Sequence, residues 1–274
     1  FALIAHSAVG VPHDLESDEG RESLGIEDLT DVTFVSMRVR EGDDASCLNL
    51  SLSRQPRVLG VDPDALASRE AFSFASTVDE TDAPWSLLDD ALPLEDGIPV
   101  YPAIGDAASL AWAMHLSIGD TLEMRDGQGK PFKVKIVGGV ANSILQGNLL
   151  INERHFRALY PGASGYRMFL VDAPAEEVDD VAKTLTRMMS DVGLEVTPTT
   201  TRLAEFNAVQ NTYLAIFQVL GGLGLLLGCV GLGTVVLRNV LERRSELGLL
   251  RAVGFHAKAL RWLIFSEHAL LLAL

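Results

Sequence analysis

The chain has 274 residues, a mean hydropathy of +0.22 and a formal net charge of −15. This length predicts one or two domains. The acidic balance argues against nucleic acid as a partner, because phosphate backbones attract basic surfaces. The two cysteines, Cys47 and Cys229, fall in parts of the chain with different expected surroundings, so we expect no disulfide between them.

The first 60 residues predict short strands joined by irregular connections. Residues 1–11 form an apolar stretch, and a polar segment follows over residues 12–31. Residues 32–40 are strand-like, residues 47–53 alternate apolar and polar side chains, and residues 57–61 are typical of a short buried strand. The pair Asp62-Pro63 ends that strand.

The middle of the chain combines turns with a β-hairpin. Residues 62–118 are rich in turn signals, with short helices expected at 63–72 and 109–115. Residues 120–125 and 132–138 predict a hairpin around residues 126–131, in which the Asp-Gly pair and the second glycine supply positive φ. A short strand at 149–151 precedes a helix that Asn152 caps and Pro161-Gly162 end.

A βαβ unit and a long helix follow. Residues 166–172 and 194–197 predict strands, and the amphipathic pattern of residues 175–192 predicts a helix with Gly193 as its C-cap. Thr200 or Thr201 caps a new helix that begins at Arg202, and the helix continues into the span without a breaker, for some 35 to 40 residues. The predicted fold class is therefore an α+β domain joined by a stalk helix to transmembrane helices.

The last quarter of the chain predicts a membrane span. Residues 214–237 carry no charge, and 24 residues make roughly 36 Å of helix, which crosses a hydrocarbon core of about 30 Å. Residues 238–262 carry six basic and two acidic side chains, a charge of +4 that marks the cytoplasmic side. Residues 1–205 are then extracytoplasmic. A second apolar run follows and neither end has the form of a natural terminus, so we expect a fragment of a longer chain.

Four glycines of this span share one helical face. Gly221, Gly224, Gly228 and Gly231 are spaced at i, i+3, i+7 and i+10. Small residues let a second helix approach closely in lipid, which favours a helix-packing face, although glycine is also simply frequent in spans.

Catalytic and metal-binding motifs find little support. Residues 127–130 form a turn that is too short for a phosphate-binding loop, and no nucleophile–base pair can be named. The scattered histidines, His6, His13, His115 and His155, lack metal-ligand spacing and are interpreted as surface or capping residues. Glu267 and His268 lie in the second apolar run. Ionisable residues in spans are usually functional or paired, but this pair is close enough to Arg261 to sit at the membrane interface, which we favour.

The most specific motif lies in residues 241–254, which by physics alone could form an interfacial helix. Its residue order resembles the signature that follows the second transmembrane helix of the FtsX/MacB-type permeases of ABC transporters. The matching positions, with Leu250 among the hydrophobic ones, are Arg243, Arg244, Glu246, Gly248, Leu250, Arg251, Ala252 and Gly254. The resemblance extends back to about residue 119 and includes the entry into the span at residues 206–212.

This resemblance implies a division into a MacB-like periplasmic core domain (1–200), a stalk and transmembrane helix (201–240), a cytoplasmic coupling segment (241–261) and the start of the next span (262–274). It implies a multi-pass protein of the inner membrane that binds no cofactor itself. ATP and Mg²⁺ would bind to a separate ATP-binding subunit, and a second permease copy or a homologous permease would complete the dimer. The family's role would be export, lipoprotein release or mechanotransmission, with a possible extracytoplasmic partner or cargo.

The alternative is a membrane-anchored extracytoplasmic binding or sensor module without transport. It would bind its ligand in a concave apolar pocket of the outer domain. An enzyme is a more distant third possibility.

Overall fold

The computed structural model describes residues 1–43 and 55–273, and the side chains of residues 205–212 and 268–273 are not described. The predicted strand at 47–53, with Cys47, and the side chain of His268 therefore lie outside the described residues. The structure divides into two compact units, Phe1–Asn207 and Ala208–Leu274.

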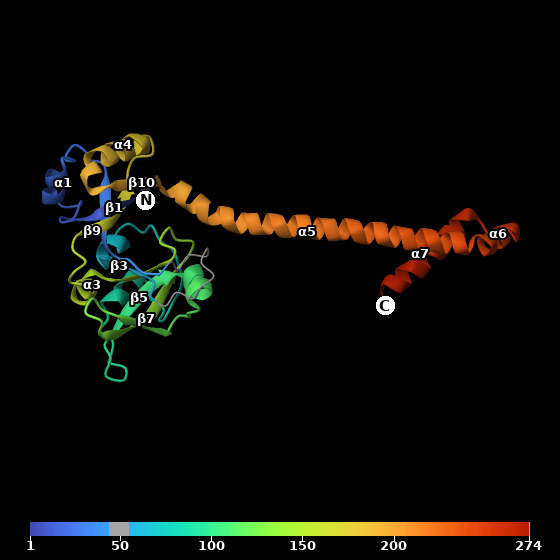
Figure 1. The fold of residues 1–274 in the computed structure, drawn as a ribbon, viewed down its shortest axis with the longest axis horizontal. Helices are drawn as coiled ribbons and strands as arrows, with labels where there is room; N and C mark the ends of the chain where they lie inside the picture. Colours follow the sequence, from blue (N-terminus) through green and yellow to red (C-terminus); the bar gives the residue numbers. More distant parts are fainter. Residues whose placement is uncertain (44–54, 274) are drawn as a thin grey trace. The chain divides into compact units, whose positions relative to one another are not determined.

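The first unit is an α+β fold around one large sheet (Figure 1), which confirms the predicted fold class. The strand order is β10-β1-β9-β2-β3-β8-β5-β7-β4, with β6 paired to β7. The strands are β1 (Leu3–Val11), β2 (Thr33–Arg40), β3 (Arg57–Val61), β4 (Phe74–Thr77), β5 (Val100–Asp106), β6 (Thr121–Arg125), β7 (Pro131–Val140), β8 (Asn148–Asn152), β9 (Tyr166–Asp172) and β10 (Leu194–Pro198). The helices are α1 (Asp18–Leu24), α2 (Pro63–Ala67), α3 (Glu153–Leu159), α4 (Val178–Met188), the 3₁₀ turns η1 (Pro84–Asp89) and η3 (Ser190–Val192), and the π-helix η2 (Ser109–Met114).

The strands β10, β1, β9 and β2 form a ferredoxin-like arrangement. Strand β1 is antiparallel to both β9 and β10, so β9 and β10 run parallel with β1 between them. Helix α4 connects β9 to β10, and α1 connects β1 to β2 across β9 in the same way. The predicted βαβ unit is therefore present in split form, interlocked with a second one.

Strand β1 explains why the sequence showed only an apolar stretch at residues 1–11. Leu3 packs in the core beneath α1 and α4, whereas the next residue, Ile4, packs in the core on the opposite face. Phe34 and Val35 of β2 divide in the same way. Because successive side chains of a strand point to opposite faces, a sheet covered on both faces shows no polar alternation.

The predicted hairpin is confirmed as β6 and β7, which pair antiparallel from Thr121 with Lys135 to Arg125 with Pro131. In its turn the Asp126 carboxylate accepts hydrogen bonds from the N–H groups of Gln128 and Lys130. Gly129 has a φ of 83°, but Gly127 does not adopt positive φ, so only the second glycine is needed for the turn geometry.

Several elements differ from the sequence prediction. Strand β5 lies in the region expected to consist of turns, which Pro102 had suggested. Strand β8 pairs only with Ile104 and Gly105, so Pro102 occupies a part of β5 with a neighbour on one side, where its missing N–H is tolerated. The helix expected at 63–72 is shortened to α2, and residues 109–114 form a π-helix. The helix expected at 175–192 is divided into α4 and η3, and Gly193 caps η3 with a φ of 64°.

The predicted long helix is confirmed as α5 (Thr199–Glu242), which continues for 44 residues and is longer than expected. Its start is fixed in the first unit, where the N–H of Thr199 donates to the carbonyl of Ala2 at 3.0 Å. Leu203 packs against the core there. The second unit adds α6 (Arg244–Ala252) and α7 (Ala257–Ala273).

We predict that Phe169→Ala lowers the free energy of unfolding of the first unit by about 3–5 kcal/mol. The Phe169 side chain is 1% exposed in the core beneath α1 and α4, and its removal leaves a cavity. Urea unfolding of the full chain in detergent, followed by the fluorescence of the buried Trp85, measures the change. The control is Val9→Ala, which truncates a side chain 59% exposed on β1 and should cost less than about 0.5 kcal/mol. Equal losses in both variants would contradict the assignment of this core.

Candidate functional site

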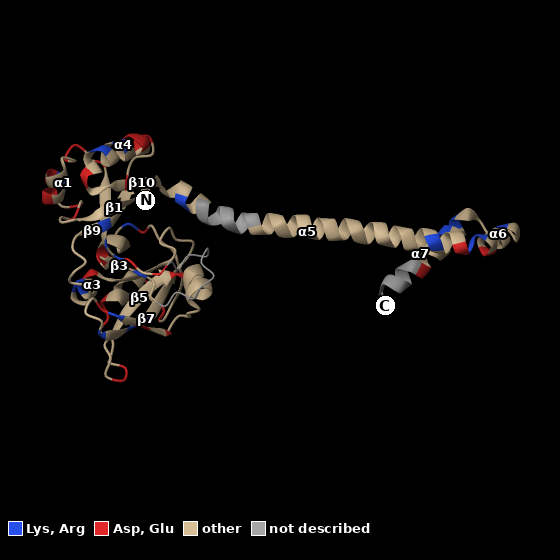
Figure 2. Ribbon diagram, viewed as in Figure 1, with Lys and Arg blue, Asp and Glu red and all other residues tan. Residues whose placement is uncertain are grey.

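The apolar part of α5 is the one described helix that is long and apolar enough to cross a membrane. It runs over Tyr213–Glu242, 30 residues with a mean hydropathy of 2.2, and none of it is buried against the rest of the chain. Figure 2 shows this stretch without charged residues until close to the end of α5, and the first charged residue in the sequence there is Arg238. Such a surface suits hydrocarbon. Helix α7 has 17 residues, so the prediction that residues 262–274 begin a second span stays a prediction.

The charged residues after α5 form a tight helical connection. Helix α5 ends at Glu242, α6 follows from Arg244, and Gly254 turns the chain before α7 begins at Ala257. Gly254 has a φ of 105°, and its N–H donates to the carbonyl of Arg251 at 3.1 Å. A side chain at this φ would be strained, which explains the glycine at this position of the motif.

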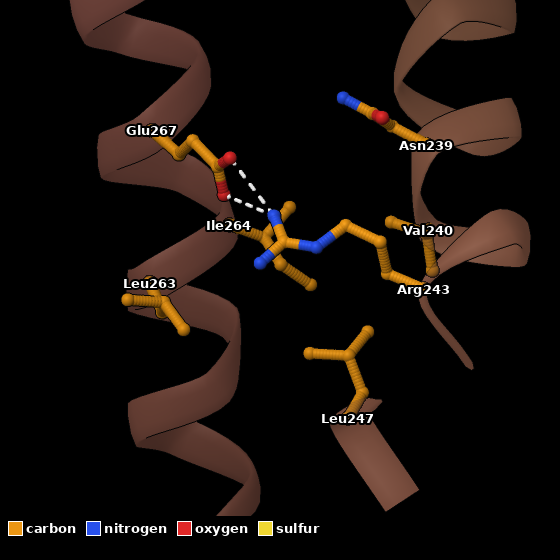
Figure 3. A pocket seen from close by; sticks show the side chains of 7 residues that line it. All are labelled: Asn239, Val240, Arg243, Leu247, Leu263, Ile264 and Glu267. Atoms are coloured by element: carbon orange, nitrogen blue, oxygen red, sulfur yellow. Dashed lines mark hydrogen bonds and ion pairs between the residues drawn. The ribbon is translucent and has the colours of Figure 1, made fainter. Parts of the chain in front are cut away.

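Arg243 joins the start of this connection to α7. Its Nη1 donates to both carboxylate oxygens of Glu267 at 2.8 Å (Figure 3). Its Nε donates to Glu246 at 3.2 Å. The hydrogen bonds to Glu246 and Glu267 raise the pKa of Arg243 above its usual value. The two side chains are 43% and 41% exposed, so solvent weakens their attraction and the pair orients the helices more than it stabilises them. We call this contact the Arg243–Glu267 clamp.

Apolar side chains surround the clamp. Val240 from α5, Leu247 from α6, and Leu263 and Ile264 from α7 line a space of about 10 Å³ beside it (Figure 3). Leu247 and Leu250 are the half-buried positions of α6. Helix α6 therefore has an inner face that packs towards the clamp.

The remaining motif residues lie on an outer face of α6. Arg244, Gly248 and Arg251 are exposed, and at 100° per residue they fall within about 60° of one another on the helix. Leu249 and Val253 are also exposed although they are large and apolar. We call the exposed residues Arg244, Gly248, Leu249, Arg251 and Val253 the α6 outer surface, in which Leu249 and Val253 lie about 100° or more around the helix from the other three. Exposed large apolar side chains and arginines are both frequent in protein contacts.

Comparisons with known proteins identify this region. Residues 219–274 match the family described as FtsX-like permease C-terminal. This part of the chain is similar to FtsX-like permeases. The match covers about one fifth of the chain and includes every residue of the predicted coupling motif, so the resemblance found in the sequence is confirmed there.

Structural comparison of the whole chain gives weaker likenesses. The periplasmic region of MacB from Actinobacillus actinomycetemcomitans is 12% identical, with 73% of this chain and 89% of that chain covered and a TM-score of 0.38. The extracellular domain of the noncanonic ABC-type transporter YknZ from Gram-positive bacteria is 13% identical, with 70% and 99% covered and a TM-score of 0.35. No curated protein matches the chain.

The structure separates the FtsX-like motif into residues with different surroundings. Arg243, Glu246 and Leu250 face or contact other parts of the connection, whereas Arg244, Gly248 and Arg251 face outwards. The sequence interpretation placed Glu267 at the interface and named no partner for it, and the structure pairs it with Arg243. A contact across 24 residues leaves no local pattern by which the sequence could reveal it.

The glycine face of α5 has no neighbour in the described part of the chain. A Cβ added at Gly221, Gly224, Gly228 or Gly231 would meet nothing within 4 Å. The same holds for Gly222 and Gly233, which lie on the opposite side of the helix. The packing role of the four glycines therefore stays a prediction. Among the described residues no cluster of His, Cys, Asp and Glu could hold a metal ion.

We predict that Glu267→Arg accelerates amide hydrogen exchange in α6 by a factor of roughly two to five, because like charges replace the ion pair of the clamp. The double variant Arg243→Glu/Glu267→Arg restores the opposite charges and should return the exchange towards that of the parent. The control is Glu242→Gln, which removes an ion pair with Arg238 that runs along α5 alone. Exchange in α6 that the swap does not slow would contradict an orienting role for the clamp.

Proposed function

We propose that the chain is the permease subunit of an ABC transporter that transmits ATP-driven motion from a separate ATP-binding subunit to an outer domain. The observation that carries the proposal is the α6 outer surface, which presents arginines and apolar side chains within the FtsX-like segment. This chain binds no nucleotide in the proposal, and ATP and Mg²⁺ belong to the partner. The work done by the outer domain would be export, lipoprotein release or mechanotransmission.

The local geometry supports docking by a short helix. In helix-in-groove recognition, one face of a helix enters the partner's groove while the opposite face stays fixed to its own protein. Helix α6 has such a division, because Leu247 and Leu250 are half-buried on one side and Gly248 and Leu249 are exposed on the other. The clamp joins Arg243, at the start of the connection, to Glu267 within α7. In the proposal, a displacement of α6 therefore also displaces α5 and α7.

Charge supports the proposed orientation in the inner membrane. The second unit has six basic and three acidic residues, whereas the first unit has 16 basic and 34 acidic residues, a net charge of −18. Basic segments beside a span stay in the cytoplasm. The proposal therefore places α6 in the cytoplasm, with residues 1–205 outside.

A sensor module without transport is the second candidate. It shares the span and the outer domain but needs no ATPase contact, so the adjacent genes distinguish the two. A neighbouring gene for an ABC ATP-binding subunit supports the permease, and a neighbouring kinase-like gene supports the sensor.

We predict that Arg251→Glu weakens association with the ATP-binding subunit about tenfold or more, since arginines at the centre of an interface are frequent hot spots. Arg251 is exposed on α6, so the variant should leave the unfolding of the first unit unchanged. Copurification from membranes and ATPase activity of the complex measure the effect. Glu246→Lys should also uncouple the ATPase, but it disturbs Arg243 as well and is the less direct test.

The matched control is Lys258→Glu, which makes the same charge change at an exposed position of α7 outside the motif. We expect it to retain the ATPase. Copurification that is unchanged in Arg251→Glu, or lost equally in both variants, would contradict docking through α6.

We predict that Gly224→Leu reduces self-association or pairing with a homologous permease, because a bulky side chain separates helices that pack through small residues. Gly222→Leu adds the same bulk to the opposite side of α5 and should have little effect. Sedimentation in detergent and chemical crosslinking in membranes report the dimer fraction. An equal loss of dimer in both variants would argue against this glycine face as the contact.

A further inference from the structure

A polar cleft lies in the first unit beside the start of α5. Its volume is about 370 Å³, within the range of small-molecule sites. His6 of β1, Arg167 next to it on β9 and Glu195 of β10 contribute from the sheet. Arg57 of β3, Glu41 after β2 and Arg202 of α5 complete the charged lining. The cleft is thus polar, whereas the binding-module hypothesis had anticipated an apolar pocket.

The cleft concentrates positive charge in a strongly acidic unit. Arg57, Arg167 and Arg202 come from three separate elements and face two carboxylates, in a unit whose net charge is −18. Glu41 is an example of a carboxylate that two of these arginines bind. One of its oxygens lies 2.9 Å from Arg57 and the other 3.3 Å from Arg167. Guanidinium groups have five N–H donors and are well suited to carboxylate and phosphate.

The pKa of His6 indicates that the electrostatic potential in the cleft is positive. Burial is the main reason that its pKa falls to about 4, and Arg57, Arg202 and Arg167 lower it further while Glu41 opposes them. The arginines therefore outweigh the carboxylate at this point. His6 is neutral at pH 7 and leaves a ring nitrogen able to accept or donate a hydrogen bond. His6 is half-buried in the middle of strand β1, so it caps no helix and lines this cleft.

We propose that this cleft binds a small ligand through an oxyanion group, a carboxylate or a phosphate. The three arginines supply the attraction, and the limited volume selects a small molecule or the end of a longer one. Arg202 lies in the first turn of α5, so the ligand contacts the helix that continues as the membrane span. The proposal does not depend on the permease function, since a transporter and a sensor could both use such a site.

The test titrates the purified full chain in detergent with inorganic phosphate and, separately, with succinate, at constant ionic strength, by isothermal titration calorimetry. We expect at least one of them to bind saturably with a Kd below about 1 mM. Binding of phosphate alone indicates a phosphate ligand, and binding of succinate alone indicates a carboxylate. Arg202→Gln should weaken binding about tenfold or more, because it removes charge-assisted hydrogen bonds.

Two further variants make the result decisive. Arg187→Gln removes the same charge from an exposed position on α4, which covers the other face of the sheet, and should leave the Kd unchanged. Arg57→Gln tests the opposite wall and should weaken binding as Arg202→Gln does, with thermal unfolding showing that both variants are folded. The proposal is overturned if neither anion saturates by about 10 mM, tenfold above the expected constant. It is equally overturned if Arg187→Gln weakens binding as much as Arg202→Gln, because the attraction is then general and not that of a site.

Discussion

The unbroken hydrogen bonding of α5 is the constraint on which the two parts of this molecule depend. In hydrocarbon every backbone N–H and C=O needs a partner within the chain, and a helix provides one for each residue. The 44 residues of α5 extend this arrangement from Thr199 to Glu242, roughly 66 Å at about 1.5 Å per residue. Only part of that length is needed for a core of about 30 Å. The remainder keeps helical geometry up to a start that is hydrogen-bonded and packed in the first unit.

At the other end of α5, a second constraint comes from charge. The FtsX-like segment has many ionisable groups within a short connection, and unpaired charges there would leave α6 free to reorient. Arg243 satisfies two carboxylates from different helices, Glu246 and Glu267. In the proposed function, Arg243 holds α6 in place, and docking would be carried out by the exposed residues of the α6 outer surface. The spacing of the motif alone could not have distinguished these roles, because Arg243, Arg244, Glu246 and Arg251 are all charged and lie within nine residues of the sequence.

Local rules accounted for the elements whose signals are local. The β6–β7 hairpin, the Asn152 cap of α3 and the glycine turn at Gly193 each follow from a few adjacent residues, and the span follows from length and hydropathy. The failures share a different cause. Strand β1 is buried on both faces, strand β5 tolerates Pro102 because of where its neighbour ends, and Glu267 finds its partner on another helix. The low pKa of His6 could not be predicted either, because it arises from burial and from arginines on β3, β9 and α5. Each depends on tertiary contacts that no short stretch of sequence contains.

Arg202 lies in the first turn of α5, and Arg243 directly follows its last residue. A ligand at one end of α5 could therefore affect the other end. A ligand changes a conformational equilibrium only by as much as its affinity differs between the two states. In the proposed anion site, an oxyanion contacts Arg202. Its affinity therefore depends on where the first turn of α5 lies relative to β1, β9 and β10. In the proposed function, the ATPase interacts with the same helix through α6 and the clamp. A movement at one end of a stiff helix also moves its other end. Ligand binding and nucleotide-driven motion would therefore be coupled through α5 without any contact between their sites. By linkage this coupling is reciprocal, so the occupied ATPase state would change the affinity of the cleft for its anion by the same factor.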